Sequence, residues 1–121
     1  MVKDAFLRRV NQEIKEIVGE IISSELKDPR VGMATVVSVD LATDLGHAKI
    51  YVSVIGDADE QARTMEGIRS ATGYIRTELS DRTRLKFVPE LVFYLDTSAE
   101  YAAHIESLLK QIRKERGDEP S

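Results

Sequence analysis

Apolar residues recur every three or four positions in three stretches of the chain, which is the spacing of a helix with one buried face. The first stretch begins at Leu7, and Pro29 disfavours helical geometry at the residue before it, so this helix is expected to end near Leu26. The second stretch covers residues 62–79. The third is expected to turn these residues towards the core: Tyr101, Ile105, Leu108, Leu109 and Ile112.

Alternation of inward and outward side chains predicts three β-strands. The first two are joined by a turn at residues 43–46 and are expected to form an antiparallel hairpin with one solvent-exposed face. The third covers residues 90–95, and the crossover before it is long enough for parallel pairing. The residues expected to share a face are Met33, Thr35, Val37, Val39 and Leu41 in the first strand, and Ala48, Ile50, Val52 and Val54 in the second.

These elements predict an α+β domain, with a three-stranded sheet and helices packed on one of its faces. A chain of 121 residues is expected to form one domain, here residues 1–116, and residues 117–121 are expected to be a disordered tail. The order of elements matches the K-homology (KH) domain in its type II arrangement. In that RNA-binding fold, two helices meet at a Gly-x-x-Gly loop that clamps nucleotide backbones.

The second helical stretch contains a weak point at Ala71, Thr72 and Gly73, so it is expected to form a kinked helix pair. A glycine within a helix costs about 0.5–1 kcal/mol relative to alanine, and a β-branched threonine is a poor helix former. Such a glycine is typical of a kink, or of a place where a ligand or another backbone comes close. Arg69 and Arg76 flank this point, where a phosphate could approach. A glycine that only allows two elements to pack closely is the other interpretation.

Charge is distributed unevenly along the chain. The net charge is −4, yet residues 69–86 contain five basic and two acidic residues and form the only basic segment. Because nucleic-acid affinity depends on a local patch more than on the overall sign, this segment is a candidate RNA-binding surface. The chain has no cysteine, which excludes disulfides and thiolate metal sites. No apolar run is long enough for a membrane span, and a cytoplasmic protein is expected.

The sequence offers little for catalysis. His47 and His104 are isolated, and neither lies at metal-ligand spacing from carboxylates. The acidic residues after the second strand, which include Asp57 and Glu60, are explained by a capping box at the start of a helix. There is no nucleophile–base motif and no glycine-rich phosphate loop. The sequence therefore predicts no enzymatic activity, no cofactor and no metal site.

Four segments, in order along the chain, resemble the bacterial ribosome-binding factor A family. They are residues 28–33 (DPRVGM), 44–52 (DLGHAKIYV), 71–76 (ATGYIR) and 85–93 (LKFVPELVF). The resemblance implies a type II KH-like fold with an Ala-x-Gly kink in place of the clamp loop. It also implies binding to the free small ribosomal subunit late in assembly, help in maturing the 5′ end of small-subunit rRNA, and a link to growth in the cold.

The resemblance and the basic segment together indicate where RNA is expected to bind. The primary candidates are Arg69, Ala71, Thr72, Gly73, Tyr74, Arg76, Arg82, Arg84 and Lys86, and the secondary candidates are Arg8, Arg9, Lys27 and Arg30. Replacing both Arg69 and Arg76 is expected to weaken binding and to leave the fold intact.

The expected partner is the small ribosomal subunit with its rRNA, bound by a monomer, with no membrane and no small-molecule substrate. An α+β protein-interaction module without direct RNA binding is the alternative, and it accounts better for the net negative charge.

Overall fold

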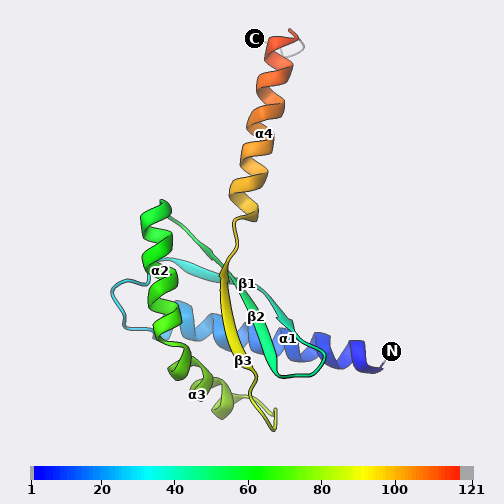
Figure 1. Ribbon diagram of the computed structural model, residues 1–121, viewed down its shortest axis with the longest axis vertical. Coiled ribbons are helices and arrows are strands. Elements are labelled where there is room, and N and C mark those ends of the chain that lie inside the picture. The colour runs from blue at the N-terminus through cyan, green and yellow to red at the C-terminus, as the bar shows by residue number, and fades with distance from the viewer. Residues whose placement is uncertain (1, 118–121) are drawn as a thin grey trace.

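The computed structural model describes residues 2–117, and its elements follow the predicted order (Figure 1). Of the expected disordered tail, residues 118–121 lie outside the described residues. The elements are α1 (Val2–Glu20), the π-helix η1 (Ile21–Glu25), β1 (Ala34–Leu41), β2 (His47–Val54), α2 (Ala58–Ser70), α3 (Thr72–Arg82), β3 (Glu90–Leu95) and α4 (Ser98–Glu115).

The three strands form one sheet in the order β1-β2-β3. β1 and β2 pair antiparallel as the predicted hairpin, and β3 pairs parallel to β2. The inward residues predicted for β2 are all buried, and Leu91 and Phe93 of β3 join them. The parallel pairing that the length of the helical crossover allows is therefore confirmed, and β3 lies beside the central strand β2.

The predicted face of β1 is wrong over half of the strand. Val39 and Leu41 point inward as expected, but so do Ala34 and Val36. The register against β2 shifts between Val36 and Ser38, which marks a β-bulge. One extra residue in a strand reverses the alternation of side chains, so the residues before the bulge face the opposite way from a regular strand.

α1, α2 and α3 supply the helical side of a single hydrophobic core. Ile14 of α1, Ile68 of α2 and Ile75 of α3 are fully buried in the same cluster as the inner face of the sheet. In Figure 1, α1 crosses behind the strands, and α2 and α3 lie beside β3. This arrangement confirms the α+β, type II KH-like fold with a kinked helix pair.

The first helix ends close to where the sequence predicts. α1 passes directly into the π-helix η1, and the N–H of Leu26 donates to the carbonyl of Ile21 at 3.2 Å. Leu26 itself has an extended conformation. The segment that follows leads to β1 through the DPRVGM motif.

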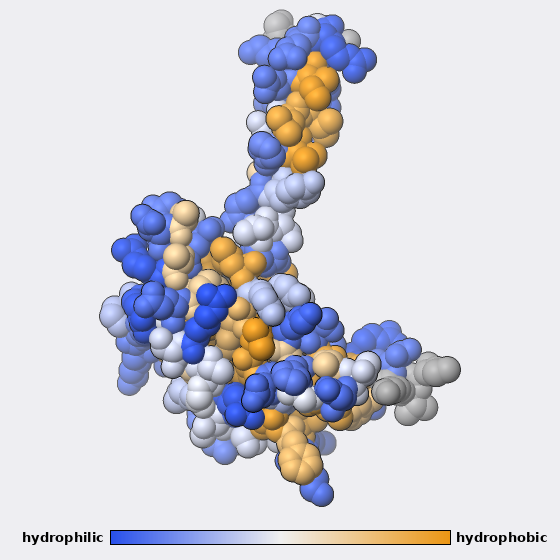
Figure 2. Space-filling view, in the orientation of Figure 1, coloured by the Kyte–Doolittle hydropathy of each residue, from blue (hydrophilic) through white to orange (hydrophobic). Residues whose placement is uncertain are grey.

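α4 contradicts the prediction that its apolar residues face the core. No residue of α4 is buried, and Figure 1 shows the helix extending away from the sheet. Its apolar side chains form an uncovered stripe along one side of the helix, seen in orange in Figure 2. A hydrogen bond from Gln61 to Glu100 connects α2 to the first turn of α4. Periodicity identifies which side of a helix is apolar, but it does not say whether a surface of the same chain covers that side.

Candidate nucleic-acid interface

The kink between α2 and α3 is confirmed, and its centre is Ala71. Ala71 lies between the two helices with φ −90° and ψ 6°. The hydroxyl of Thr72 donates to the carbonyl of Arg69 at 2.7 Å and so satisfies an acceptor at the end of α2. A threonine that disfavours a continuous helix is thus well placed where the helix is interrupted.

Gly73 lies in the first turn of α3, not at the centre of the kink. A Cβ atom built on Gly73 would have no neighbour within 4 Å among the described residues. The interpretation that this glycine permits close packing of two elements is therefore wrong. The space beside Gly73 is open to an approaching molecule.

A different glycine, Gly67, is the one that packing requires. A Cβ atom at Gly67 would lie 2.8 Å from Cγ2 of Val31 and 3.3 Å from Cβ of Arg30. We expect Gly67→Ala to lower the free energy of unfolding by about 1–3 kcal/mol through overpacking. Gly73→Ala is expected to raise it by about 0.5–1 kcal/mol, because alanine is the better helix former. Urea unfolding of the two variants checks both signs, and a Gly67→Ala protein as stable as the wild type would contradict this packing.

Arg69 binds a backbone carbonyl of the edge strand β3, and Arg76 binds carbonyls of the segment just before it. Arg69 donates to the carbonyl of Phe93 at 2.9 Å, and Arg76 donates to the carbonyls of Pro89 and Val88, both at 3.1 Å. These bonds fasten the kinked helices to β3 and to the segment that leads into it, and they satisfy carbonyl acceptors of both. The expectation that both arginines can be replaced without cost to the fold is therefore revised. Each guanidinium has five N–H donors, so both keep donors for a phosphate.

The side chain of Arg82 stabilises the fold by binding carboxylates of η1 and α3. Its guanidinium bridges two carboxylates, with 2.8 Å between Nη1 and Oε2 of Glu25 and 2.7 Å between Nη2 and Oε1 of Glu78. The hydrogen bond from Arg82 lowers the pKa of Glu25. Because two carboxylates compensate one guanidinium, little positive charge is left there for a phosphate. Arg82 fastens the end of α3 to η1.

Arg84 and Lys86 follow in the loop before β3, and both are exposed. Neither side chain makes an ion pair within the described part of the chain. The ammonium of Lys86 lies 5.9 Å from the ring centroid of Phe87, a cation–π contact that leaves its charge accessible. These two side chains are thus free cations of the predicted basic segment.

A cleft of about 440 Å³ adjoins the kink. It is lined by Glu25, Leu26, Lys27, Asp28, Ala71 and Tyr74. Tyr74 is 47% exposed and is the aromatic side chain of this wall. Both carboxylates are held by arginines, Glu25 by Arg82 and Asp28 by Arg30, so Lys27 is the one uncompensated charge in the described lining. The cleft therefore combines an aromatic ring with a cation beside the kink.

Of the other secondary candidates, only Arg30 makes ion pairs within residues 2–117. It binds Asp28 at 2.6 Å, Glu66 at 3.0 Å and the hydroxyl of Ser70 at 3.1 Å. Chiefly through the side-chain hydrogen bond from Arg30, the pKa of Asp28 falls to about 2. Arg8 and Arg9 are exposed on α1, and neither belongs to the lining of the cleft at the kink.

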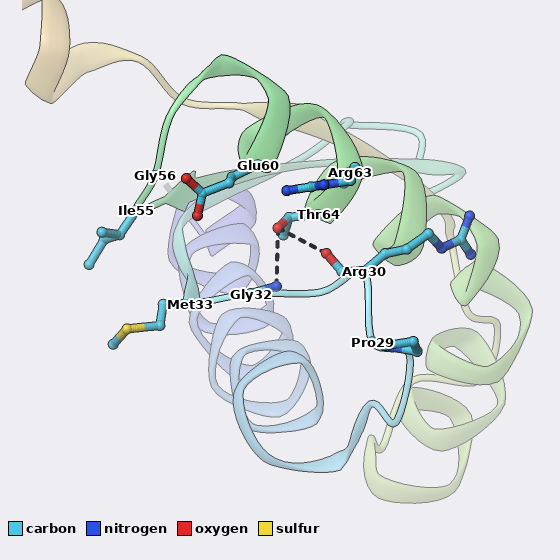
Figure 3. Close-up of a pocket in the computed structure, with 9 residues that line it drawn as sticks. All are labelled: Pro29, Arg30, Gly32, Met33, Ile55, Gly56, Glu60, Arg63 and Thr64. Atoms are coloured by element: carbon cyan, nitrogen blue, oxygen red, sulfur yellow. Dashed lines mark hydrogen bonds between the residues drawn. The ribbon is translucent and has the colours of Figure 1, made fainter.

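Figure 3 shows how the DPRVGM segment is fastened to α2. The buried hydroxyl of Thr64 accepts from the N–H of Gly32 at 3.1 Å and donates to the carbonyl of Arg30 at 3.3 Å. A cleft of about 690 Å³ lies at this junction, and the side chains of Met33 and Ile55 project from its rim (Figure 3). The DPRVGM segment, one of the four on which the family resemblance rests, thus serves to hold the loop against α2.

Two aromatic residues near the basic segment were missed by the sequence reasoning. Phe87 is 78% exposed and Phe6 is 38% exposed, and both line a cleft next to Arg84 and Lys86. The exposure of Phe87 could have been inferred from its position in a loop, after a lysine and just before the proline that precedes the third strand. Nothing in the sequence places Phe6, near the start of α1, beside that loop.

Residues 2–117 contain neither a candidate metal-binding cluster nor a candidate membrane span. No group of three or more histidine and acidic side chains in this range is placed to hold a metal ion. No helix in this range is long and apolar enough to cross a membrane.

Comparison with known proteins gives a consistent result. A family model described as Ribosome-binding factor A matches residues 7–109. A protein named Ribosome-binding factor A from Natranaerobius thermophilus is 48% identical over 104 residues, which cover 86% of this chain and 79% of that protein.

Solved structures agree in fold. The crystal structure of ribosome-binding factor A from Thermus thermophilus superposes with a TM-score of 0.66 at 24% identity, covering 74% of this chain and 93% of that one. A homology model of the Thermus thermophilus factor, fitted into a cryo-EM map of a 30S complex, superposes with a TM-score of 0.60 at 26% identity. It covers 72% of this chain and 91% of that one.

Proposed function

Because the chain belongs to the ribosome-binding factor A family, we propose that it binds the free small ribosomal subunit and assists late maturation of the small-subunit rRNA, including processing of its 5′ end. The fitted Thermus thermophilus coordinates support this proposal, since that factor is placed in a complex with a 30S particle. The protein acts as a monomer in the cytoplasm. It acts through binding alone, by holding rRNA in one conformation while maturation proceeds.

The contact surface extends from the kink to the loop before β3. We call it the kink–loop surface and define it by Lys27, Gly73, Tyr74, Arg84 and Lys86. The observation that carries this assignment is that cations without an ion pair line the clefts at the kink and at the loop before β3. Arg30 and Arg82 are neutralised by carboxylates, whereas Lys27, Arg84 and Lys86 have no ion-pair partner in residues 2–117. Free cations are what phosphate contact requires.

Co-sedimentation with purified small subunits at increasing salt tests the proposed function. Phosphate contacts release counterions, so the logarithm of the association constant should fall linearly with the logarithm of salt concentration. Pre-treatment of the subunits with nuclease should abolish the association. Binding that survives nuclease and does not respond to salt would refute RNA contact and would favour the protein-interaction module, for which the uncovered stripe of α4 is the available surface.

A further inference from the structure

The cleft beside the basic loop is formed by three segments that are distant in the sequence. The start of α1, the turn between β1 and β2, and the loop before β3 surround a volume of about 570 Å³, which is within the usual range of small-ligand sites. We call this the loop cleft. Its lining is mainly apolar and includes Phe6, Leu45, Leu85 and Phe87, with Arg84 and Lys86 at its edge.

The aromatic side chains of the loop cleft are unusually exposed. Phe87 is 78% exposed, more than any other phenylalanine or tyrosine of the described chain, and Phe6 also faces solvent in part. An isolated exposed apolar side chain is ordinary, but two aromatic rings lining one cleft are not. Phe87 has the larger exposed area for stacking against a flat ring, and the ammonium of Lys86 lies 5.9 Å from its ring centroid.

The charges around the loop cleft favour an anion. The side chains of Arg84 and Lys86 make no ion pair in the range that the structure describes, although the backbone N–H of Arg84 donates to the carboxylate of Glu13 at 3.4 Å. Asp44 is the one acidic residue of the lining, and its carboxylate accepts the N–H of Gly46 at 2.8 Å. Nearby Glu13 is bound by the hydroxyl of Thr83 at 2.8 Å. These neutral donors leave both carboxylates charged, but the lining itself contains two cations, Arg84 and Lys86, against the single carboxylate of Asp44.

The turn that closes the loop cleft is strained. Leu45 has φ +63°, the left-handed region that non-glycine residues seldom adopt, and its N–H donates to the carbonyl of Ala42 at 2.9 Å. Backbone strain of this kind is concentrated at ligand sites, where the surrounding structure enforces it. Here it fixes the turn whose Leu45 lines the cleft wall.

We propose that the loop cleft binds an unpaired nucleotide of RNA, with the base stacked on Phe87 and the adjoining phosphates contacted by Arg84 and Lys86. Aromatic stacking platforms flanked by cations are the usual way in which proteins hold single-stranded RNA. A base pair within a duplex cannot offer its face to such a cleft. This inference rests on the proposed function, and it specifies unpaired RNA as what this end of the kink–loop surface recognises.

The test measures binding of a fluorescent oligoriboadenylate of about eight nucleotides, a length within the range that single-strand-binding domains cover. The wild type should bind it more tightly than a fully paired RNA duplex. Phe87→Ala and Phe87→Leu should each weaken binding by about 5- to 160-fold, the value of one stacked base, and Phe87→Tyr should stay close to the wild type. Tyr101→Ala is the control, because Tyr101 is exposed on α4. Thermal unfolding of each variant checks that the exposed position leaves the fold unchanged.

Several results would overturn the inference: no wild-type binding of the oligonucleotide, preference for the duplex, full binding by Phe87→Ala, or full binding by Phe87→Leu. The last would show that an apolar contact, and not aromatic stacking, holds the base, since leucine cannot stack. The failure of the proposed function is a separate result, namely a wild-type protein that does not co-sediment with small subunits. A wild type that binds subunits while Phe87→Ala binds the oligonucleotide normally would refute this inference alone.

Discussion

Replacing Ile75 with alanine is expected to lower the free energy of unfolding by about 2–5 kcal/mol, whereas Leu108→Ala should change it by less than about 0.5 kcal/mol. Ile75 is fully buried and is one of two buried residues that attach α3 to the core. A truncation there loses apolar burial and leaves a cavity. Leu108 is 42% exposed on α4 and, like the rest of that helix, is not part of the core.

Urea unfolding followed by circular dichroism measures both variants under the same conditions. Comparable losses for the two variants would contradict the structure, because they would show that α4 packs against the domain in solution. The comparison therefore tests the largest difference between the pattern of the sequence and the fold.

The second large effect concerns small-subunit binding. Neutralising the three free cations of the kink–loop surface, with Lys27→Gln, Arg84→Gln and Lys86→Gln combined, should weaken binding by about 10- to 100-fold at moderate salt. Each lost phosphate contact should also reduce the slope of the salt dependence by about 0.7–0.9. These side chains make no ion pair in the described structure, so stability should be unaffected.

A charge-matched control separates local contact from net charge. The variant combines Arg63→Gln, Lys110→Gln and Lys114→Gln, three exposed cations on α2 and α4 that likewise have no ion pair within residues 2–117. It removes the same total charge and should bind small subunits nearly as the wild type does. Equal losses for the two triple variants would show that only the overall charge matters and would reject the kink–loop surface.

Three arginines show why residue type and position in the sequence were not enough to identify the RNA-binding side chains. Arg69, Arg76 and Arg82 belong to the basic segment, yet they bond to carbonyls in and just before β3 or to carboxylates. Sequence gives the charge of a side chain but not its partner. Two of the three free cations, Arg84 and Lys86, were primary candidates, and the third, Lys27, was a secondary one.

The elements themselves were largely predictable because helices and strands leave a periodic pattern. The capping box of Asp57 and Glu60 at the start of α2 is confirmed, with Glu60 N–H donating to Asp57 at 2.8 Å. The bulge near Val37 was not predictable, since alternation continues to look regular on both sides of it. The loop cleft was also hidden, because Phe6 and Phe87 come together only through the tertiary fold.

Hydrogen–deuterium exchange of the protein bound to purified small subunits tests the central claim most directly. Exchange should slow in peptides that contain the kink and the loop before β3, residues 71–74 and 83–88, while peptides of α4 should exchange as in the free protein. Protection confined to α4, with the kink and the loop unchanged, would contradict RNA binding by the kink–loop surface.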